Sequence, residues 1–347
     1  MSDENRQVGL DYLRVFATLA VMVLHVAAQN WSVTDVKGYA WQTFNFYDSL
    51  VRWGVPAFLM ISGCLFLGRE IPTKRIYTKY ILRIVTAFIV WSGFYAVVDL
   101  LSGEDLKTAI GHFIAGKYHM WYLFMIVGIY ICIPVIKVIV NNEKAMEYFL
   151  ILSFLFAFVF PEIVMIANDF APAELAMLFN YINSDVKTMH MELVMGYSFY
   201  FVLGYYLNNK SLKKCKNVIC ILGLLGFAST IILSSIISIK RGEATGDYYG
   251  NFTVNILLES VMIFTLFKEA KFQNKKINQI MVKLSKYSFG AYLVHVFVIA
   301  FLIKIGINTL TFNTTVSVPV IAIIVFVISF LISCVLNHIP FINKYIV

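Results

Sequence analysis

The segment Leu10–His25, LDYLRVFATLAVMVLH, decides how this sequence is read. It opens the first long apolar stretch of the chain, yet Asp11 and Arg14 stand near its start and His25 stands at its end. With the residues that follow, the stretch reaches about 20 residues, the length of an α-helix that crosses a bilayer. The segment therefore predicts a transmembrane helix that carries ionisable groups at two depths.

The spacing of Arg14 and His25 places both side chains on one face of that helix. They are eleven residues apart in the sequence, close to three whole turns, and this spacing separates them by about 16 Å along the axis. The face thus presents a cation near one membrane surface and a titratable base more than halfway across. Such a face suits a long ligand with an anionic head and a reactive far end.

The composition of the whole chain agrees with a membrane protein. Of its 347 residues, 60% are hydrophobic and only 14% are charged, which is more apolar surface than a soluble domain of this size can bury. The net charge of +8 does not indicate nucleic acid, because the basic residues interrupt apolar runs and form no block of their own. Five cysteines occur without a CxxC pair or a Cys/His cluster, so no metal site or disulfide framework is predicted.

Apolar segments along the chain predict about ten transmembrane helices within a single domain, 1–347. They are 9–28, 47–67, 78–101, 120–139, 146–166, 190–207, 218–239, 252–267, 284–304 and 317–336. Of the 28 Lys and Arg residues, 18 lie at connections on the side of the N-terminus and seven on the opposite side. The excess predicts that both termini are cytoplasmic. The expected fold is an all-α polytopic membrane protein.

Charged residues gather at the predicted cytoplasmic side. Asp11 and Arg14 are i,i+3 neighbours that can pair, and Lys79 and Arg83 are i,i+4 neighbours on the third predicted span. Together with Arg75, they predict a cationic site at the inner surface that grips phosphate groups. For Arg75 and Lys79 an alternative stays open, in which the side chains extend to lipid headgroups.

A second group of ionisable residues lies toward the outer side and at mid-depth. It comprises His25, Asp48, Arg52, His119, His190, Glu192, Glu259 and His295. Ionisable residues in a membrane usually mark a functional site or a buried pair. Any one of them alone is more often a hydrogen-bonded core residue, and His190 and Glu192 begin their span, where water reaches them. His25 is the exception, because it lies deep in an otherwise apolar helix.

The second span contains RWGVPAFLMISGCLF, residues 52–66. Its Gly54 and Pro56 predict a kink near the outer end of the helix. Ser62 and Gly63 are small residues that let neighbouring helices approach closely, so packing is their expected role.

The fourth span opens with HMWYLFMIVGIYICIPVI, residues 119–136. His119 and Trp121 are expected at the outer interface, where tryptophan is also typical of an aromatic belt. Pro134 is expected to mark the inner end of this helix.

Five segments, in order, resemble acyltransferase family three of integral membrane proteins. More narrowly they resemble its surface-polysaccharide O-acetyltransferase branch, and the resemblance extends over nearly the whole chain. The segments are DYLRVFATLAVMVLH, RWGVPAFLMISGCLF, KYILR, HMWYLFMIVGIYICIPVI and LSKYSFGAYLVH, the last ending at His295.

The resemblance implies a bacterial cytoplasmic-membrane enzyme that moves an acetyl group from cytoplasmic acetyl-CoA to a hydroxyl of an extracytoplasmic or lipid-linked glycan. His25 would be the general base. The remaining expected site residues are Arg14 and Asp11 in the catalytic set, Arg14, Arg75, Lys79 and Arg83 at the CoA phosphates, and Arg52, His119, Trp121, Glu192 and His295 at the acceptor.

A different class of function competes with this one. Intramembrane His, Glu and Arg residues also suit a transporter of a small polar molecule such as serine, or a proton-coupled carrier. A carrier needs no CoA site, so binding of acetyl-CoA discriminates between the two. A purely structural role does not explain the clustered ionisable residues.

Overall fold

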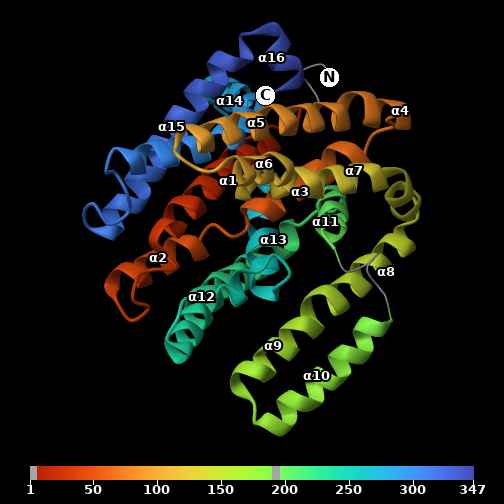
Figure 1. Cartoon of the computed structure of the whole chain (residues 1–347). Coiled ribbons are helices and arrows are strands. Elements are labelled where there is room, and N and C mark those ends of the chain that lie inside the picture. The colour runs from red at the N-terminus through yellow and green to blue at the C-terminus, as the bar shows by residue number, and fades with distance from the viewer. Residues whose placement is uncertain (1–5, 190–195) are drawn as a thin grey trace.

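The computed structural model describes residues 6–189 and 196–347 (Figure 1). Within these ranges the chain forms helices and no strand, and nine helical segments are long and apolar enough to cross a membrane. They are Val8–Asn30, Tyr39–Leu67, Thr73–Leu101, Leu106–Val140, Glu143–Phe170, Lys213–Arg241, Asp247–Glu269, Lys275–Lys304 and Thr314–Asn337. The protein is an all-α, multi-pass membrane protein.

The sixth predicted span, 190–207, overlaps with α11 (Ser198–Asn209). This helix has 12 residues, fewer than the roughly 20 that cross a bilayer. The predicted span begins at residues that the structure does not describe. Its described part is too short to count as a span, and the described residues therefore hold nine candidate spans in place of the ten predicted.

Helix α1 (Val8–Ala27) occupies the centre of the bundle (Figure 1). It packs against α3 (Gly54–Leu67), α14 (Lys275–Lys304) and α15 (Thr314–Asn337). Small and branched residues such as Leu13 and Ala17 are fully buried on it. Neighbours on several sides therefore fix its position, and a face of α1 that lines a cavity is held rigidly.

The second predicted span is broken into α2 (Tyr39–Ser49) and α3. The break precedes Gly54, the first residue of α3, and Pro56 lies in the first turn, where no intrahelical donor is needed. The predicted kink is confirmed, and it places Arg52 in the turn between the two helices.

Close packing at Gly63 is also confirmed. A Cβ added to Gly63 would lie 2.7 Å from the carbonyl carbon of Phe201 on α11. In the same contact the Cys64 thiol donates to the carbonyl oxygen of Gly204, at 3.1 Å. Glycine is thus required where α3 meets α11.

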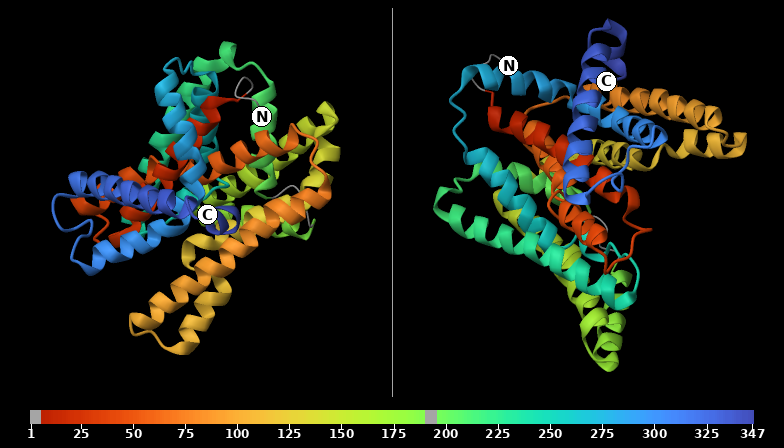
Figure 2. Two further views of the ribbon diagram at one scale, coloured as in Figure 1. Left: turned by 90° about the horizontal axis from the view of Figure 1, so that it is seen from above. Right: turned by 90° about the vertical axis from the view of Figure 1, so that its left-hand side faces the viewer.

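A long helical hairpin leads up to the fourth span. Helix α4 (Thr73–Arg75) and the π-helical segment η3 (Ile76–Ile81) run into α5 (Leu82–Leu101), and α6 (Leu106–Ala115) folds back on α5. The pair projects from the body of the bundle (Figure 2). The turn η4 (Tyr118–Met120) then enters α7 (Trp121–Val140). Pro134 lies inside α7, so the prediction that it ends the helix is wrong: one lost backbone hydrogen bond does not stop a helix that is packed on its neighbours.

The fifth span consists of α8 (Glu143–Ser153), the π-helical η5 (Phe154–Val159) and α9 (Phe160–Phe170). Helix α10 (Ala173–Thr188), which the sequence analysis did not predict, runs back along α9 and carries no buried residue. Asn168 and Asn180 join the two helices by amide hydrogen bonds of 3.3 and 2.7 Å.

The remaining helices complete the bundle around α1. They are α12 (Lys216–Arg241), α13 (Val254–Glu269) and α16 (Pro340–Tyr345). Three short turns lie between helices: η2 (Ala28–Asn30) follows α1, η6 (Lys213–Cys215) precedes α12, and η7 (Asp247–Tyr249) precedes α13. Between α12 and α13 the fully buried Glu259 accepts a 2.6 Å hydrogen bond from Thr230. The start of α1 and helix α16 lie at the same end of the molecule (Figure 1).

Candidate active site

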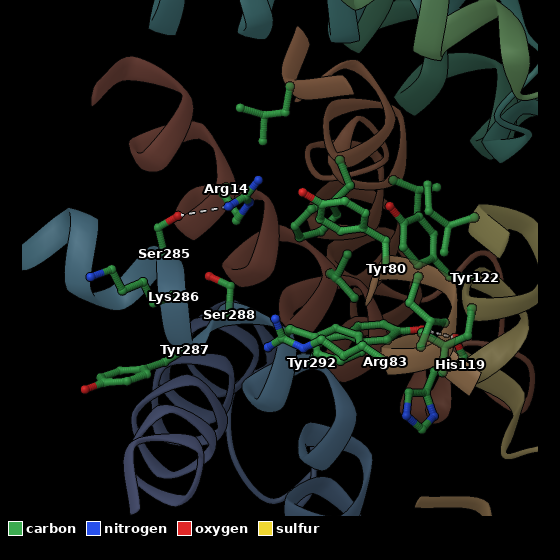
Figure 3. A pocket seen from close by; sticks show the side chains of 18 of the residues that line it. Arg14, Tyr80, Arg83, His119, Tyr122, Ser285, Lys286, Tyr287, Ser288 and Tyr292 are labelled. Atoms are coloured by element: carbon green, nitrogen blue, oxygen red, sulfur yellow. Dashed lines mark hydrogen bonds between the residues drawn. The ribbon is translucent and has the colours of Figure 1, made fainter. Parts of the chain in front are cut away.

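A cavity of about 670 Å³ lies among α1, α3, α5, α7 and α14. Arg14 and His25 both line it, so the shared face predicted for α1 does face one cavity. Figure 3 shows Arg14 and His119 on opposite sides of this space. The cavity therefore has an arginine end and a histidine end.

Two guanidinium groups line the arginine end. Arg14 Nη1 donates to Ser285 Oγ at 3.4 Å. Arg83, from α5, donates to the carbonyl oxygen of Val347, and its Cζ lies 5.6 Å from the centre of the Phe289 ring. Both groups are half-buried, and no Asp or Glu is among the residues that line this cavity, so this end of the wall is positively charged.

Aromatic side chains form the middle of the cavity. The wall residues of this kind are Phe58, Phe66, Tyr80, Tyr122, Tyr130 and Tyr292. Phe66 holds two of them in place, with ring-centre distances of 4.8 Å to Tyr80 and 4.4 Å to Tyr130. This stretch offers apolar ring faces interrupted by hydroxyl groups, which suits a thin chain containing amide groups.

Three histidine rings from three parts of the chain meet at the other end. The ring centre of His295 lies 5.1 Å from that of His25 and 5.1 Å from that of His119. His25 also has the Tyr118 ring at 5.3 Å. His25 and His119 line the cavity, so two imidazoles contribute to this end of its wall, and His25 is the more exposed of the two.

Local hydrogen bonds hold His119 in position. Its carbonyl oxygen accepts a hydrogen bond from the Tyr292 hydroxyl. Asp99, on α5, binds two residues that precede His119, namely His112 on α6 (Nδ1 at 2.7 Å) and Lys117 (Nζ at 2.8 Å). The His119 side chain is only 2% exposed and neither ring nitrogen has a hydrogen-bond partner. The ring of His119 therefore has unused hydrogen-bonding capacity at this end of the cavity.

The charge of the wall has one sign. Among the described residues that line the cavity are Arg14, Arg83 and Lys286, and none of the lining residues is Asp or Glu. The amine of Lys286 points away from Arg14 in Figure 3. The described residues also contain no group of three His, Cys, Asp or Glu that could hold a metal ion. The wall of the cavity is thus positively charged.

Comparison with known protein families matches residues 7–338 to the acyltransferase domain of family three. The chain belongs to acyltransferase family three. No curated protein and no solved structure matches it. Membership of this family implies acyl transfer and therefore an acyl donor, and the helical bundle places that chemistry in a membrane.

In this acyltransferase, several of the predicted site residues do not reach the cavity. Both carboxylate oxygens of Asp11 accept from Arg6 at 2.7 Å, so Asp11 is occupied by Arg6 and the pairing predicted with Arg14 is wrong. Arg75 and Lys79 are exposed and lie outside the cavity wall. The reason is helical phase: Tyr80, Arg83 and Ile84 lie on the face turned toward the cavity, whereas Arg75 and Lys79 lie on another face.

Two of the predicted acceptor residues also stand apart from the wall. Arg52 donates to Asp48 and lies over the Tyr249 ring, with its Cζ 4.0 Å from the ring centre. His295 is fully buried and lies behind the wall. Trp121 does line the cavity and is 41% exposed. Glu192 lies outside the described residues.

The sequence analysis missed the aromatic wall of the acyltransferase cavity. Tyr122, Ile126 and Tyr130 follow one another at intervals of four on α7, and all three line the cavity. That spacing marks a single helix face and was available in the sequence. The contacts of Asp99 with His112 and Lys117 (the Asp99 clamp) had no such signal, because the two partners lie 13 and 18 residues away across a turn.

Proposed function

We propose that this acyltransferase is an O-acetyltransferase of the surface-polysaccharide branch. It takes the acetyl group of acetyl-CoA from the cytoplasm and transfers it to a hydroxyl of a lipid-linked or extracytoplasmic glycan at a bacterial cytoplasmic membrane. The observation that supports this most strongly is a single cavity lined by two guanidinium groups at one end and two imidazoles at the other.

The donor fits the length and chemistry of the cavity. The phosphates of CoA would meet Arg14 and Arg83, since guanidinium groups bind phosphate by paired, charge-assisted hydrogen bonds. The pantetheine arm is a thin chain with two amide groups and would pass the tyrosine hydroxyls of the middle section. The thioester would then stand beside His25, about 16 Å along α1 from Arg14.

The proposed reaction uses His25 as a general base. Its free ring nitrogen takes the proton of the acceptor hydroxyl while the hydroxyl oxygen attacks the thioester carbonyl carbon. The resulting oxyanion accepts a hydrogen bond from an N–H of His119. The carbon–sulfur bond then breaks, and the imidazolium of His25 returns the proton to the departing thiolate. The products are the acetyl ester and free CoA.

Aromatic groups at the outer mouth favour a sugar acceptor. The Trp121 ring is exposed, and its centre lies 5.7 Å from that of Tyr197. Flat aromatic faces pack well against the apolar face of a sugar ring, and the sugar hydroxyls can then turn toward His25 and His119. Arg52 is bound to Asp48 and has no part in this proposal.

The proposal is tested by mass spectrometry of surface glycans from cells with and without the gene. We expect the glycans of the deletion strain to lose one acetyl unit per modified sugar, and a plasmid copy of the gene to restore it. An unchanged glycan profile, with purified protein that does not bind acetyl-CoA, would contradict the proposal and favour a carrier.

A further inference from the structure

The inference concerns His295, which lies behind the cavity wall and which the proposed reaction does not use. It is fully buried on α14. Its ring lies between two others, with centre distances of 5.1 Å to His25 and 5.1 Å to His119. A residue in this position cannot reach a substrate in the cavity except through His25 or His119.

The hydrogen bond at Nδ1 fixes which nitrogen of His295 carries the proton. Nδ1 lies 2.5 Å from the carbonyl oxygen of Tyr292. A carbonyl oxygen only accepts hydrogen bonds, so Nδ1 must be the N–H donor. In the neutral ring Nε2 is then an acceptor with a free lone pair. This Nε2 is buried and has no hydrogen-bond partner.

His25 is placed to supply the missing donor. Two imidazoles joined at the usual N···N distance of about 2.9 Å have ring centres about 5 Å apart, because each nitrogen lies about 1.1 Å from its ring centre. The observed separation of 5.1 Å therefore needs only ring rotation to form the bond. A buried acceptor left without a partner is costly, which favours that rotation.

We propose that His295 is a positioning residue for His25. Its Nε2 accepts a hydrogen bond from one N–H of His25, and this bond fixes the tautomer in which the other nitrogen of His25 presents its lone pair to the cavity. The chain of contacts runs from the Tyr292 carbonyl through His295 to His25. It plays the part that a carboxylate plays in many catalytic sites. The inference rests on the proposed function, since it assigns a purpose to the His25 tautomer.

The inference is tested with three variants of the full-length protein in membrane vesicles that contain the natural acceptor. His295→Gln keeps an acceptor near the position of Nε2, His295→Asn keeps only a group near Nδ1, and His295→Phe keeps the ring volume alone. Transfer of radiolabelled acetyl from acetyl-CoA gives the maximal rate and KM, and acetyl-CoA binding by the purified variants reports folding.

We expect His295→Phe and His295→Asn to lower the maximal rate by about 100-fold or more, the usual contribution of a general base. His295→Gln should stay within about tenfold of the natural protein, and KM for acetyl-CoA should not change in any of the three. If His295→Phe does not fold, the comparison of Gln with Asn remains decisive, since these differ by one methylene.

Three results would overturn the inference. A fully active His295→Phe variant would show that the ring only packs. Equal losses in the Gln and Asn variants would show that the Nε2 acceptor is not used. A loss of about 100-fold in the maximal rate of a His119→Phe variant, with no loss in the His295 variants, would show that His119 and not His295 orients His25. Retained transfer in His25→Ala is a separate result, because it contradicts the proposed function itself.

Discussion

Arg14 and His25 stand on one unbroken helix, eleven residues apart, and line the same cavity. The residues between them that face the cavity include Val21, so the connecting wall is apolar. A cation and a base are therefore held at a fixed separation by backbone hydrogen bonds alone.

Replacing Arg14 with alanine is expected to weaken acetyl-CoA binding about tenfold or more, because a charge-assisted hydrogen bond is lost. Isothermal titration of purified protein measures the dissociation constant. Lys79→Ala should change it less than about twofold, since the Lys79 side chain is exposed and outside the wall. Lys213→Ala, at an exposed site remote in sequence, serves as the control. An unchanged constant in Arg14→Ala would leave Arg14 a structural partner of Ser285.

Replacing His25 with alanine is expected to abolish acetyl transfer while the protein still folds and binds acetyl-CoA. The physical reason is the loss of the base that takes the hydroxyl proton, worth about 100- to 10,000-fold in rate. Transfer of labelled acetyl in membrane vesicles is the measurement. Leu24→Ala removes a neighbouring side chain that lies outside the wall and should remain active. Full activity of His25→Ala would end the catalytic assignment.

Asp99→Ala is expected to loosen the loop that carries His119, because Asp99 binds both His112 and Lys117. Amide hydrogen exchange should become faster in residues 112–120. The maximal transfer rate should fall by about tenfold or more through misplacement of His119. The acetyl-CoA dissociation constant should hold, since the arginine end is untouched. Lost activity without faster exchange would argue against the clamp.

Arg52→Met is expected to destabilise the protein by about 3–5 kcal/mol, because it leaves the buried Asp48 carboxylate without its partner. Thermal unfolding in detergent measures this. The double variant Asp48→Asn/Arg52→Met removes both charges and should recover much of the loss. A stable Arg52→Met protein with a raised KM for the acceptor would instead support the substrate-binding role predicted from the sequence.

Gly63→Ala is expected to destabilise the protein by about 1–3 kcal/mol, as for other overpacked sites. The added Cβ would lie 2.7 Å from the carbonyl carbon of Phe201, which is backbone and cannot move aside cheaply. Gly128→Ala is the matched control, since its Cβ would meet nothing within 4 Å. Equal melting temperatures for the two variants would show that α3 and α11 separate easily.

The helical membrane fold could be predicted from the sequence because its signal is local. Long apolar runs and their periodicity identify spans, and the face shared by Arg14 and His25 follows from helix geometry. The break before Gly54 likewise has a local cause. Pro134 misled the prediction because the effect of a proline inside a helix depends on packing against neighbours, which sequence alone does not show.

The candidate site was only partly predictable, because its contacts join distant parts of the chain. Which residue pairs with Asp11, and whether Lys79 or Arg83 turns inward, depends on how helices rotate against one another. The sequence placed His25 and His119 toward the outer side and His295 nearer mid-depth. Only the packed structure shows that His25 and His119 line the cavity and that His295 lies behind its wall.

The unbroken helix between Arg14 and His25 also has a consequence for the choice of donor. A helix does not stretch, so under the proposed function a donor that contacts both residues must have its anionic group and its reactive carbon at that separation. A short donor such as acetyl phosphate would hold its anchor and its carbonyl too close together to reach both ends. The backbone of α1 thus selects the donor by length before any side chain recognises it.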